Sequence, residues 1–483
     1  RFSILFGIYF RIMDMKTKKT KIVATLGPAS ANEGVLKDMI DAGLNVIRMN
    51  FSHGDHVTHQ KNLNLVRKVA KQTGSRVSIL QDLSGPKIRI GDFKEGSVVL
   101  KKGDAFTLTT KKVSGDESIV YINYEKLPKE VKVGSSIMIF DGKIHLKVKK
   151  IVGEEIKCTV IEGGEISNRK GVNVPGANLS IKSLTEKDIK DLEFGVKNKV
   201  EFVAFSFVRT VNDVLELKSL LKKASSKSLV ISKIETTEAV ENFDEILNVT
   251  DGVMVARGDL AVEIGAENVP VLQKQIISKC NKAGKPVITA TQMLDSMEHS
   301  PVPTRAEVSD VANAIFDGTD AVMLSGETAT GQFPVESIKV MTEVARVTEN
   351  SLPPRKFIEL EGEYDIVNAV TLSVVRVAED VKASAIIALT ESGLTAKMIT
   401  RFRIPFPIFS ISPHEFACNQ LVLSYGVTPV KMTCSKNVDV FTRQITDFAL
   451  DNKIVKKGDK IVISAGMPFG KVGSTNTLFV LKV

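Results

Sequence analysis

Eight short apolar runs recur along the first two-thirds of this chain, and each one ends in polar or glycine residues. They are rich in β-branched residues and lie at 21–27, 45–52, 77–84, 202–208, 229–235, 252–258, 286–292 and 321–327. Near-continuous apolar runs separated by helix-length segments are typical of buried parallel strands in βα units. Eight such units predict a closed (β/α)₈ barrel.

The C-terminal ends of the runs predict where chemistry would take place, because barrels of this class carry their sites on that face. The ends supply Arg48, Asn50, Ser52, Asp82, Lys233, Glu235, Asp259, Thr291, Gln292, Ser325 and Glu327. One polar residue at one strand end could simply begin a turn. Basic and acidic groups that converge from several strands indicate a site instead.

Two segments in this set predict a divalent-metal site beside a fixed cation: ISKIE, with Lys233 and Glu235, and VARGD, with Asp259. Mg²⁺ or Mn²⁺ binds carboxylate oxygens and commonly needs only one or two acids together with a substrate anion. A neighbouring lysine could stabilise negative charge that develops during the reaction.

Phosphoryl chemistry would have to rely on such groups, because neither GxxxxGK[ST] nor GxGxxG is present in working form. Positioning and charge neutralisation are sufficient for phosphoryl transfer. Arg48 and Arg89 offer planar donor forks for a phosphate. The hydroxyls of Thr291 and Ser325 could hold a water or relay a proton, or could merely form turns.

Composition excludes several classes of function. The net charge is +9, but the lysines are scattered and only 6% of residues are aromatic, so nucleic-acid binding is not expected. The four cysteines form no CxxC pair, which argues against a disulfide framework and for a cytoplasmic protein. His53, His56 and His59 are spaced so that a helix could align them on a metal, although ordinary surface histidines are the simpler interpretation.

Residues 1–14 are expected to be an extension of uncertain origin, because Met15 and the basic residues after it resemble a natural start. The apolar run at 2–10 is too short for a bilayer crossing, which takes about 20 residues. It also lacks a small-x-small cleavage site. The remnant of a leader, and hence an organelle location, is the alternative.

The spacing of the runs also predicts the domains. Residues 15–85 and 183–350 would form the barrel with the active site. Polar–apolar alternation within 86–182 predicts an inserted small antiparallel β domain, a β-barrel, that acts as a lid and excludes water from the site. After a charged linker at 355–364, the αβ alternation of 351–483 predicts an open α/β regulatory domain.

A loop in this last domain is a candidate effector site. Thr390, Ser392, Gly393 and Thr395 precede a helix expected to begin near Ala396. Small hydroxylated residues at a helix start can cradle a phosphate, and they are also ordinary helix caps. Both interpretations stay open.

The chain resembles the pyruvate kinase family from Met15 to Val483. The resemblance lies in TKIVATLGPAS, NVIRMNFSHG, QDLSGPKIR, RKGVNVPG, SKIE, VMVARGDLAVEI, TATQMLDSM, PTRAEVSDVANA and MLSGETA. It implies a barrel, a β lid and a C-terminal domain that binds regulators. It also implies a Mg²⁺-dependent phosphotransferase of glycolysis that converts phosphoenolpyruvate and ADP into pyruvate and ATP. A homotetramer with a sugar-phosphate or AMP effector is expected from the same resemblance.

The resemblance also implies roles for matching residues. Catalysis would involve Arg48, Lys233, Thr291 and Ser325. Substrate would contact Arg48, Arg89, Lys233, Gly258, Asp259 and Thr291. Nucleotide would contact Asn50, Phe51, Ser52, His53, Arg89 and Lys170. Glu235 and Asp259 would bind Mg²⁺ (or Mn²⁺).

One departure from the family pattern affects the monovalent cation. K⁺-dependent members carry a glutamate where this chain has Lys87, and usually a threonine where it has Leu83. A fixed ammonium can replace a mobile cation, so we expect that K⁺ is not required. Asn50, Ser52 and Asp82 would remain as the residual cation shell.

Two rival functions remain at this point. A sensing homologue without turnover would be expected to lose Lys233, Glu235 or Asp259, and the chain keeps all three. A metal-dependent aldolase could use a similar carboxylate pair, but it would not need Arg89, Lys170 and the lid together.

Overall fold

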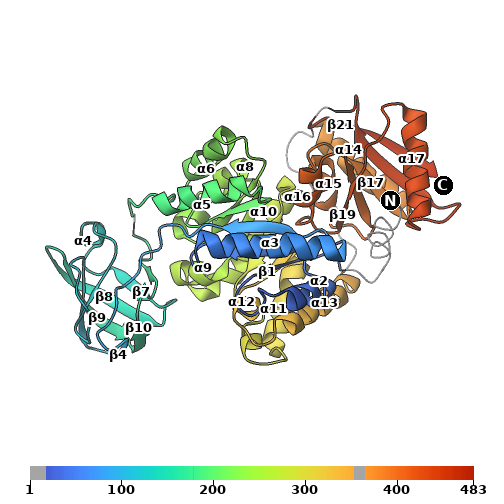
Figure 1. Cartoon of the computed structure of the whole chain (residues 1–483). Coiled ribbons are helices and arrows are strands. Elements are labelled where there is room, and N and C mark those ends of the chain that lie inside the picture. Colours follow the sequence, from blue (N-terminus) through green and yellow to red (C-terminus); the bar gives the residue numbers. More distant parts are fainter. Residues whose placement is uncertain (1–17, 178, 353–364, 471) are drawn as a thin grey trace.

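The structure is a computed structural model that describes residues 18–177, 179–352, 365–470 and 472–483. The predicted extension at 1–14 and the linker at 355–364 lie outside these ranges. Three bodies follow one another across the molecule: an inserted unit of β-strands at the predicted lid position, a central barrel, and a C-terminal sheet with its helices (Figure 1). None of the helices in the described ranges combines the length and apolar character that a bilayer crossing requires.

The central body confirms the predicted barrel, since eight strands close on themselves and every neighbouring pair is parallel. In wall order they are β1 (Lys21–Thr25), β16 (Ala321–Leu324), β15 (Val287–Ala290), β14 (Gly252–Ala256), β13 (Leu229–Ile234), β12 (Phe202–Phe205), β3 (Ser78–Asp82) and β2 (Val46–Asn50). Successive side chains along the barrel strands belong to two different buried clusters. Val23, Val46 and Leu80 belong to one buried cluster, and Ile22 and Ile47 belong to another that includes residues of the surrounding helices.

Helices follow the strands and cover the barrel. They are α2 (Glu33–Asp41), α3 (His56–Thr73), α5 (Glu186–Lys197), α6 (Val211–Lys223), α7 (Thr237–Glu241), α8 (Phe243–Val249), α9 (Arg257–Ile264), α10 (Val269–Ala283), α11 (Arg305–Asp317), α12 (Gly326–Ala329) and α13 (Pro334–Asn350), with 3₁₀ turns at Ala266–Asn268 and Asp295–Glu298. Local sequence fixes their ends. In α11, for example, Thr304 and Glu307 form a capping box, and Gly318 ends the helix in the left-handed conformation.

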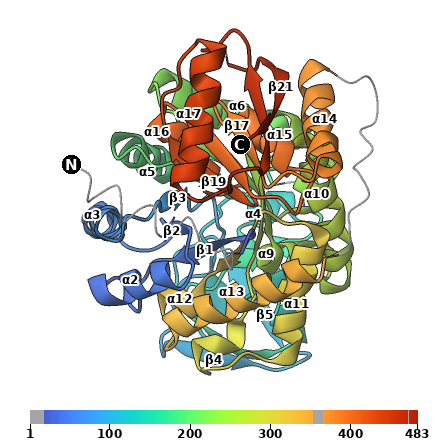
Figure 2. The ribbon, with the colours of Figure 1, turned by 90° about the vertical axis from the view of Figure 1, so that its right-hand side faces the viewer.

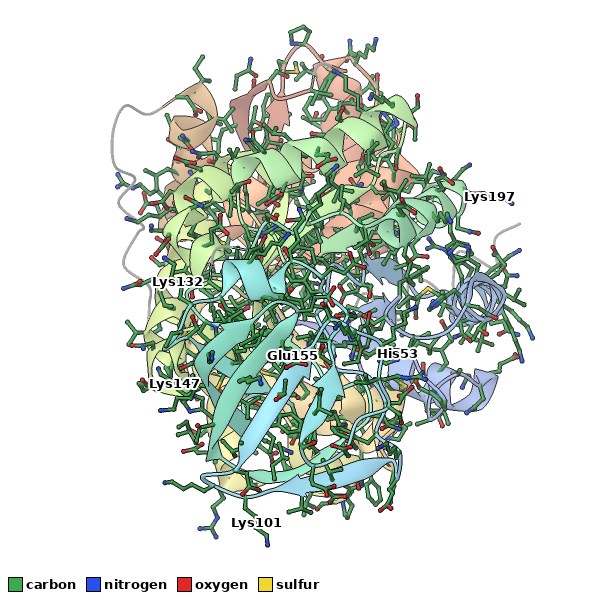
Figure 3. All side chains as sticks on the ribbon, turned by 90° about the vertical axis from the view of Figure 1, so that its left-hand side faces the viewer. His53, Lys101, Lys132, Lys147, Glu155 and Lys197 are labelled. Atoms are coloured by element: carbon green, nitrogen blue, oxygen red, sulfur yellow. The ribbon has the colours of Figure 1, made fainter. Side chains whose placement is uncertain are left out.

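The inserted unit consists of β4 (Ser97–Leu100), β5 (Ala105–Thr109), β6 (Ile119–Tyr121), β7 (Ser136–Ile139), β8 (Ile144–Val152), β9 (Glu155–Glu162), β10 (Gly164–Ser167), β11 (Val172–Asn173) and the short α4 (Leu127–Glu130). They form a six-stranded sheet, ordered β11-β7-β8-β9-β5-β6, and a two-stranded sheet. The pairing is antiparallel except that β5 and β6 run parallel, because residues 110–118 return the chain to its starting end. Lys101, Lys132 and Lys147 stand at the margins of this unit (Figure 3).

The C-terminal body is the expected α/β sheet, in the order β19-β18-β17-β20-β21 (Figure 2). Its strands are β17 (Ala385–Leu389), β18 (Ile408–Ser412), β19 (Val427–Lys431), β20 (Lys460–Gly466) and the antiparallel β21 (Thr475–Lys482), and its helices are α14 (Ile366–Asp380), α15 (Leu394–Thr400), α16 (Glu415–Leu421) and α17 (Val438–Asp451). Helix α15 begins at Leu394, two residues before the predicted start, so Thr395 lies in the helix.

The C-terminal body also contributes to the barrel core. Val422 and Leu423, which follow α16, belong to the same buried cluster as Val23, Val46 and Leu80. They are 4% and 0% exposed. The barrel therefore has one end covered by the C-terminal body, while the ends that carry the predicted site residues lie on the other face.

Candidate active site

A buried lysine lies at the centre of the charged strand ends. The Nζ of Lys233, at the end of β13, donates to Ser206 Oγ at 2.7 Å. The same atom lies 3.3 Å from Glu235 Oε2 and 3.5 Å from Asp82 Oδ1. Burial alone would lower the pKa of Lys233, but the negative charges of Asp82 and Glu235 outweigh it and raise this pKa. The ammonium is therefore held charged in a site that is largely closed to water.

Asp82 links this lysine to Arg48. The Arg48 Nε donates to Asp82 Oδ2 at 2.6 Å, and its Nη1 donates to Thr25 Oγ1 at 3.0 Å. Burial alone would raise the pKa of Asp82, but Lys233 and Arg48 outweigh it and lower this pKa below its usual value. Two cations thus stand side by side on one carboxylate, an arrangement that favours an incoming anion.

The predicted metal ligands Glu235 and Asp259 lie beside the same lysine. The Glu235 Oε1 accepts a hydrogen bond from the Phe207 N–H at 2.7 Å. Its buried Oε2 accepts no hydrogen bond, although it lies 3.3 Å from the Lys233 ammonium. Burial raises the pKa of Glu235, Lys233 opposes this, and the negative charge of Asp259 adds to the rise. These facts fit a cation between the two carboxylates.

The type of metal can be argued from the donor set. No group of three or more His, Cys, Asp or Glu side chains gathers into a metal cage in the described part of the chain. Two carboxylates alone suit Mg²⁺ or Mn²⁺, which complete their shells with water and substrate oxygens, better than they suit zinc.

Lys87 reaches this group from the loop that leads from β3 into the inserted unit. Its Nζ donates to Asp259 Oδ1 at 3.0 Å and lies 6.0 Å from the centre of the Phe207 ring. The structure thus shows the Lys87 ammonium paired with the carboxylate of Asp259.

Two members of the predicted cation shell bond to each other, since the Ser52 N–H donates to Asn50 Oδ1 at 3.1 Å.

Thr291 and Gly258 are joined directly by a hydrogen bond. The Gly258 N–H donates to Thr291 Oγ1 at 2.8 Å. Thr291 has φ 72°, a left-handed conformation that a β-branched residue rarely adopts. The Arg257 Nη2 donates to the Thr291 carbonyl at 2.7 Å and helps to hold it there. Such local strain is common at functional sites.

The other predicted residues surround this centre. Arg89 and Lys170 bond within the base of the lid: the Arg89 Nη1 donates to the Arg169 carbonyl at 3.1 Å, and the Lys170 Nζ lies 4.2 Å from the Phe140 ring centre. Ser325 stands at the start of α12, where its N–H donates to the Glu327 carboxylate at 2.7 Å.

The segment that contains His53, His56 and His59 makes packing contacts and hydrogen bonds with neighbouring residues. Phe51 stacks on His59 with ring centres 3.9 Å apart, and the His59 Nε2–H donates to the His53 carbonyl at 2.9 Å. His56 Nε2 lies 2.7 Å from Asp191 Oδ1. The alternative of a metal held by these histidines is not supported within the described ranges.

The predicted effector loop borders a cavity of about 240 Å³ in the C-terminal body. Thr390, Ser392 and Thr395 line it together with Cys434 and Ser474. The Gly393 N–H donates to Thr390 Oγ1 at 2.9 Å, and Thr395 Oγ1 lies 2.7 Å from Thr475 Oγ1.

Two residues that hold the charged groups were missed by sequence reasoning. Thr25 ends β1 and accepts from Arg48, and Ser206 follows β12 and accepts from Lys233. The sequence offered a way to find them, because the ends of β1 and β12 were the only barrel strand ends from which no site residue was predicted.

The family models and the curated relatives that match this chain name the same family. The model of the pyruvate kinase barrel domain matches residues 17–338, and that of the pyruvate kinase alpha/beta domain matches residues 368–481. Among curated relatives, pyruvate kinases of Staphylococcus epidermidis and Staphylococcus aureus are 44% and 45% identical over 466 residues, which cover 95% of this chain and 80% of theirs.

A solved structure agrees. The crystal structure of a pyruvate kinase from Cryptosporidium parvum aligns with a TM-score of 0.89 at 36% identity and covers 96% of both chains. The matches span the barrel that carries Lys233 and the C-terminal sheet alike. We conclude that the chain is a phosphotransferase that belongs to the pyruvate kinase family.

Proposed function

We propose that the chain transfers the phosphoryl group of phosphoenolpyruvate to ADP and releases pyruvate and ATP. The observation that carries this proposal is the convergence of Lys233, Arg48, Glu235 and Asp259 on one face of the barrel. An anionic substrate with a phosphate and a carboxylate needs this combination of fixed cations and metal-binding oxygens.

Each residue takes a role that its position supports. Arg48, fixed by Asp82 and Thr25, orients the phosphoryl group, and Arg89 and Lys170 in the lid base bind nucleotide phosphates. Lys233 neutralises charge on the transferring group and on the enolate oxygen that remains. Glu235 and Asp259 would hold Mg²⁺, which supplies charge neutralisation to the phosphoryl oxygens when it is bound.

The second half of the reaction adds a proton to the enolate carbon. The Thr291 hydroxyl, held in position by the Gly258 N–H, is the group that we assign to this proton path, and Ser325 is a second hydroxyl assigned to it. Asn50, Phe51, Ser52 and His53 would face the nucleotide. Closure of the lid would exclude water from the transfer step.

We further propose that the reaction needs no K⁺, because the Lys87 ammonium already supplies a fixed positive charge next to Asp259. The cavity at Thr390–Thr395 is assigned to a sugar-phosphate or AMP activator. Assembly as a homotetramer and a cytoplasmic location complete the proposal.

A coupled assay tests the reaction directly. Pyruvate formation from phosphoenolpyruvate and ADP is followed with Mg²⁺, with excess chelator, and in Lys233→Met. Turnover that requires the metal and is lost in the variant supports the proposal. Turnover that persists with chelator, or an inactive wild type across a panel of sugar phosphates and AMP, contradicts it.

The effector assignment is tested separately. The phosphoenolpyruvate saturation curve is measured with each member of the same panel. A shift to lower half-saturation with one activator supports the site, and curves that coincide throughout exclude it.

A further inference from the structure

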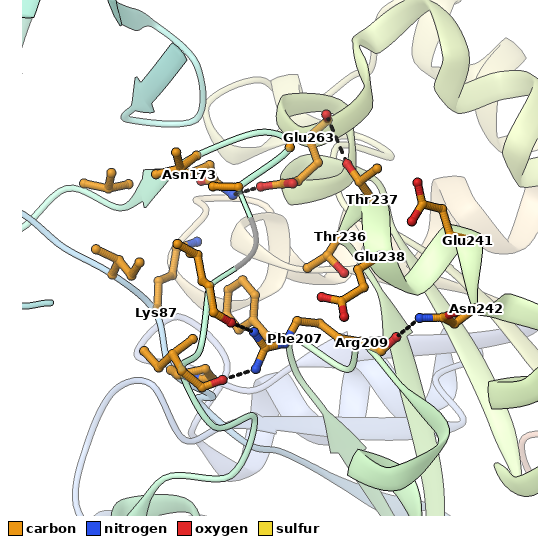
Figure 4. Close-up of a pocket in the computed structure, with 18 residues that line it drawn as sticks. Lys87, Asn173, Phe207, Arg209, Thr236, Thr237, Glu238, Glu241, Asn242 and Glu263 are labelled. Carbon is orange, nitrogen blue, oxygen red and sulfur yellow. Dashed lines mark hydrogen bonds between the residues drawn. The ribbon is translucent and has the colours of Figure 1, made fainter. Parts of the chain in front are cut away.

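A second cavity lies beside the active site, where the lid joins the barrel. It has a volume of about 400 Å³ and does not include Lys233, Glu235 or Asp259 in its lining. One wall comes from the two chain segments that connect the inserted unit to the barrel, residues 86–88 and the described residues of 172–177 and 179–181. The other comes from residues after β12 and β13 and from Glu263 in α9 (Figure 4). We call it the hinge pocket. Its volume lies in the range of small-molecule sites.

The two walls of the hinge pocket differ in chemistry. The wall on the lid side is mostly apolar, with Ile88, Val174, Leu179 and Ile181, and its polar members are Lys87 and Asn173. On the barrel side, the carboxylates of Glu238 and Glu241 stand at the pocket (Figure 4). A ligand that fills the space would therefore meet hydrocarbon on one side and negative charge on the other.

The positive charges at the hinge pocket are already engaged. Lys87 donates to Asp259, and the Arg209 guanidinium donates to the carbonyls of Leu179 and Ile181, which fastens the second hinge segment to the barrel. Glu238 and Glu241, in contrast, make no side-chain hydrogen bond or ion pair with any described residue.

Glu263, the third carboxylate in the lining, accepts a hydrogen bond from Asn173 Nδ2 at 3.3 Å. The Arg209 guanidinium keeps its positive charge, because the carbonyls that it bonds are neutral. With three carboxylates against Arg209 and the Asp259-paired Lys87, the pocket keeps an excess of negative charge, and Glu238 and Glu241 are the two acids left to pair with a ligand.

We propose that the hinge pocket binds a small organic cation, a primary amine that carries an apolar chain or ring. The ammonium group would pair with Glu238 and Glu241, and the apolar part would pack on Ile88, Leu179 and Ile181. Charge pairing beside an apolar surface gains from both sources, because the apolar contact excludes water from the ion pair.

Occupancy would also affect the lid, since one wall of the pocket belongs to the lid connections and the other to the barrel. The amine would hold the two walls at the separation seen here. The Phe207 N–H, next to the pocket, donates to Glu235 in the active site. We therefore expect the amine to lower kcat without competing with phosphoenolpyruvate. This effect on turnover rests on the proposed function, whereas the binding itself does not.

Calorimetry with 4-phenylbutylamine tests binding on the full-length protein, with 4-phenylbutan-1-ol as the uncharged counterpart. We expect the amine to bind at least about tenfold more tightly than the alcohol, as for a charge-assisted contact. The variant Glu238→Gln/Glu241→Gln should lose this preference. Glu245→Gln, on the exposed face of α8, is the matched control and should keep it.

A filled pocket provides an independent variant. Ala177→Trp places a large ring among the apolar residues and should abolish binding of the amine. Equal affinity for amine and alcohol, unchanged binding in both pocket variants, or no measurable amine binding to the wild type would overturn the proposal. If binding behaves as expected but turnover is unaffected by the amine, the link to the lid is wrong and the site itself stands. If the protein binds the amine but shows no pyruvate kinase turnover, the proposed function fails and the pocket remains.

Discussion

The ammonium of Lys87 lies 3.0 Å from Asp259 Oδ1, so the loop that leads from β3 into the inserted unit forms an ion pair with a proposed metal ligand. The two side chains are 24% and 20% exposed, which leaves the pair partly screened by solvent. The Lys87 ammonium therefore belongs both to the hinge pocket and to the proposed metal site at Asp259.

Lys87→Glu should create a requirement for K⁺. The variant removes the fixed cation and adds a carboxylate near Asp259, and a mobile cation would then be needed to offset the negative charge. Initial rates at saturating Mg²⁺ with K⁺, and with a bulky organic cation in its place, measure the effect. Lys101→Glu at the lid margin is the control and should behave as the wild type. Strong K⁺ activation of the wild type would rule out the idea.

Lys233→Met should lower kcat by about 10²- to 10³-fold or more, the usual cost of removing one preorganised group that stabilises transition-state charge. It also leaves Asp82 and Glu235 without their shared cation. Steady-state kinetics give the result, with Lys61→Met on the exposed side of α3 as the control for a lost lysine. A variant that changes only KM would show that Lys233 merely binds substrate.

Arg403→Met should destabilise the fold by about 3–5 kcal/mol, because it leaves a buried carboxylate without its partner. The Arg403 Nη2 donates to Asp320 Oδ2 at 2.6 Å and to Asn281 Oδ1 at 2.5 Å, and the pair is 2% and 4% exposed. Urea denaturation midpoints measure the loss. Arg443→Met, on the exposed face of α17, should stay within about 0.5 kcal/mol of the wild type. A similar midpoint for both variants would contradict this role.

Lys21 predicts a pH dependence of stability. Burial lowers the pKa of Lys21 to about 8 in the fold, from 10.5 when exposed, although Glu349 and Asp320 offset part of it. Between these values the unfolded chain binds more protons than the folded one, so stability rises with pH in this window. Lys21→Met should lack this component, on the order of 2 kcal/mol.

Urea unfolding of both proteins at about pH 7 and about pH 10 separates this component from changes that they share. Lys37→Met on the exposed side of α2 should follow the wild type at both values, since Lys37 is 58% exposed. If the free energy of unfolding changes by the same amount between the two pH values in the wild type and in Lys21→Met, the Lys21 amine keeps its charge on folding.

The barrel and the composition of its site could be predicted because each depends on local sequence. Every apolar run became a wall strand, and the run ends brought Lys233, Glu235, Asp82 and Arg48 together, since parallel strands in a barrel end on one face. The C-terminal strands followed from the same periodicity. The start of α15 was placed two residues late because Gly393 ends the loop earlier than the turn-like residues suggested.

Contacts between distant segments could not be predicted. Nothing in the sequence around Lys87 indicates that it pairs with Asp259, because the two residues lie far apart along the chain and meet only in the folded protein. The parallel pairing of β5 and β6 depends on how residues 110–118 cross the sheet. Arg403 and Asp320 meet only because the C-terminal body docks on the barrel.

The position of Leu423 in the barrel core has a consequence for how the protein is made. The last barrel strand ends at Leu324, but the residue that covers the far end of the barrel is synthesised well after it. Until α16 and the residues after it leave the ribosome, nothing covers the end of the barrel core that contains Val23, Val46 and Leu80. The apolar core of the barrel is therefore expected to stay open to water in the nascent chain until the C-terminal body has been synthesised and has docked on it.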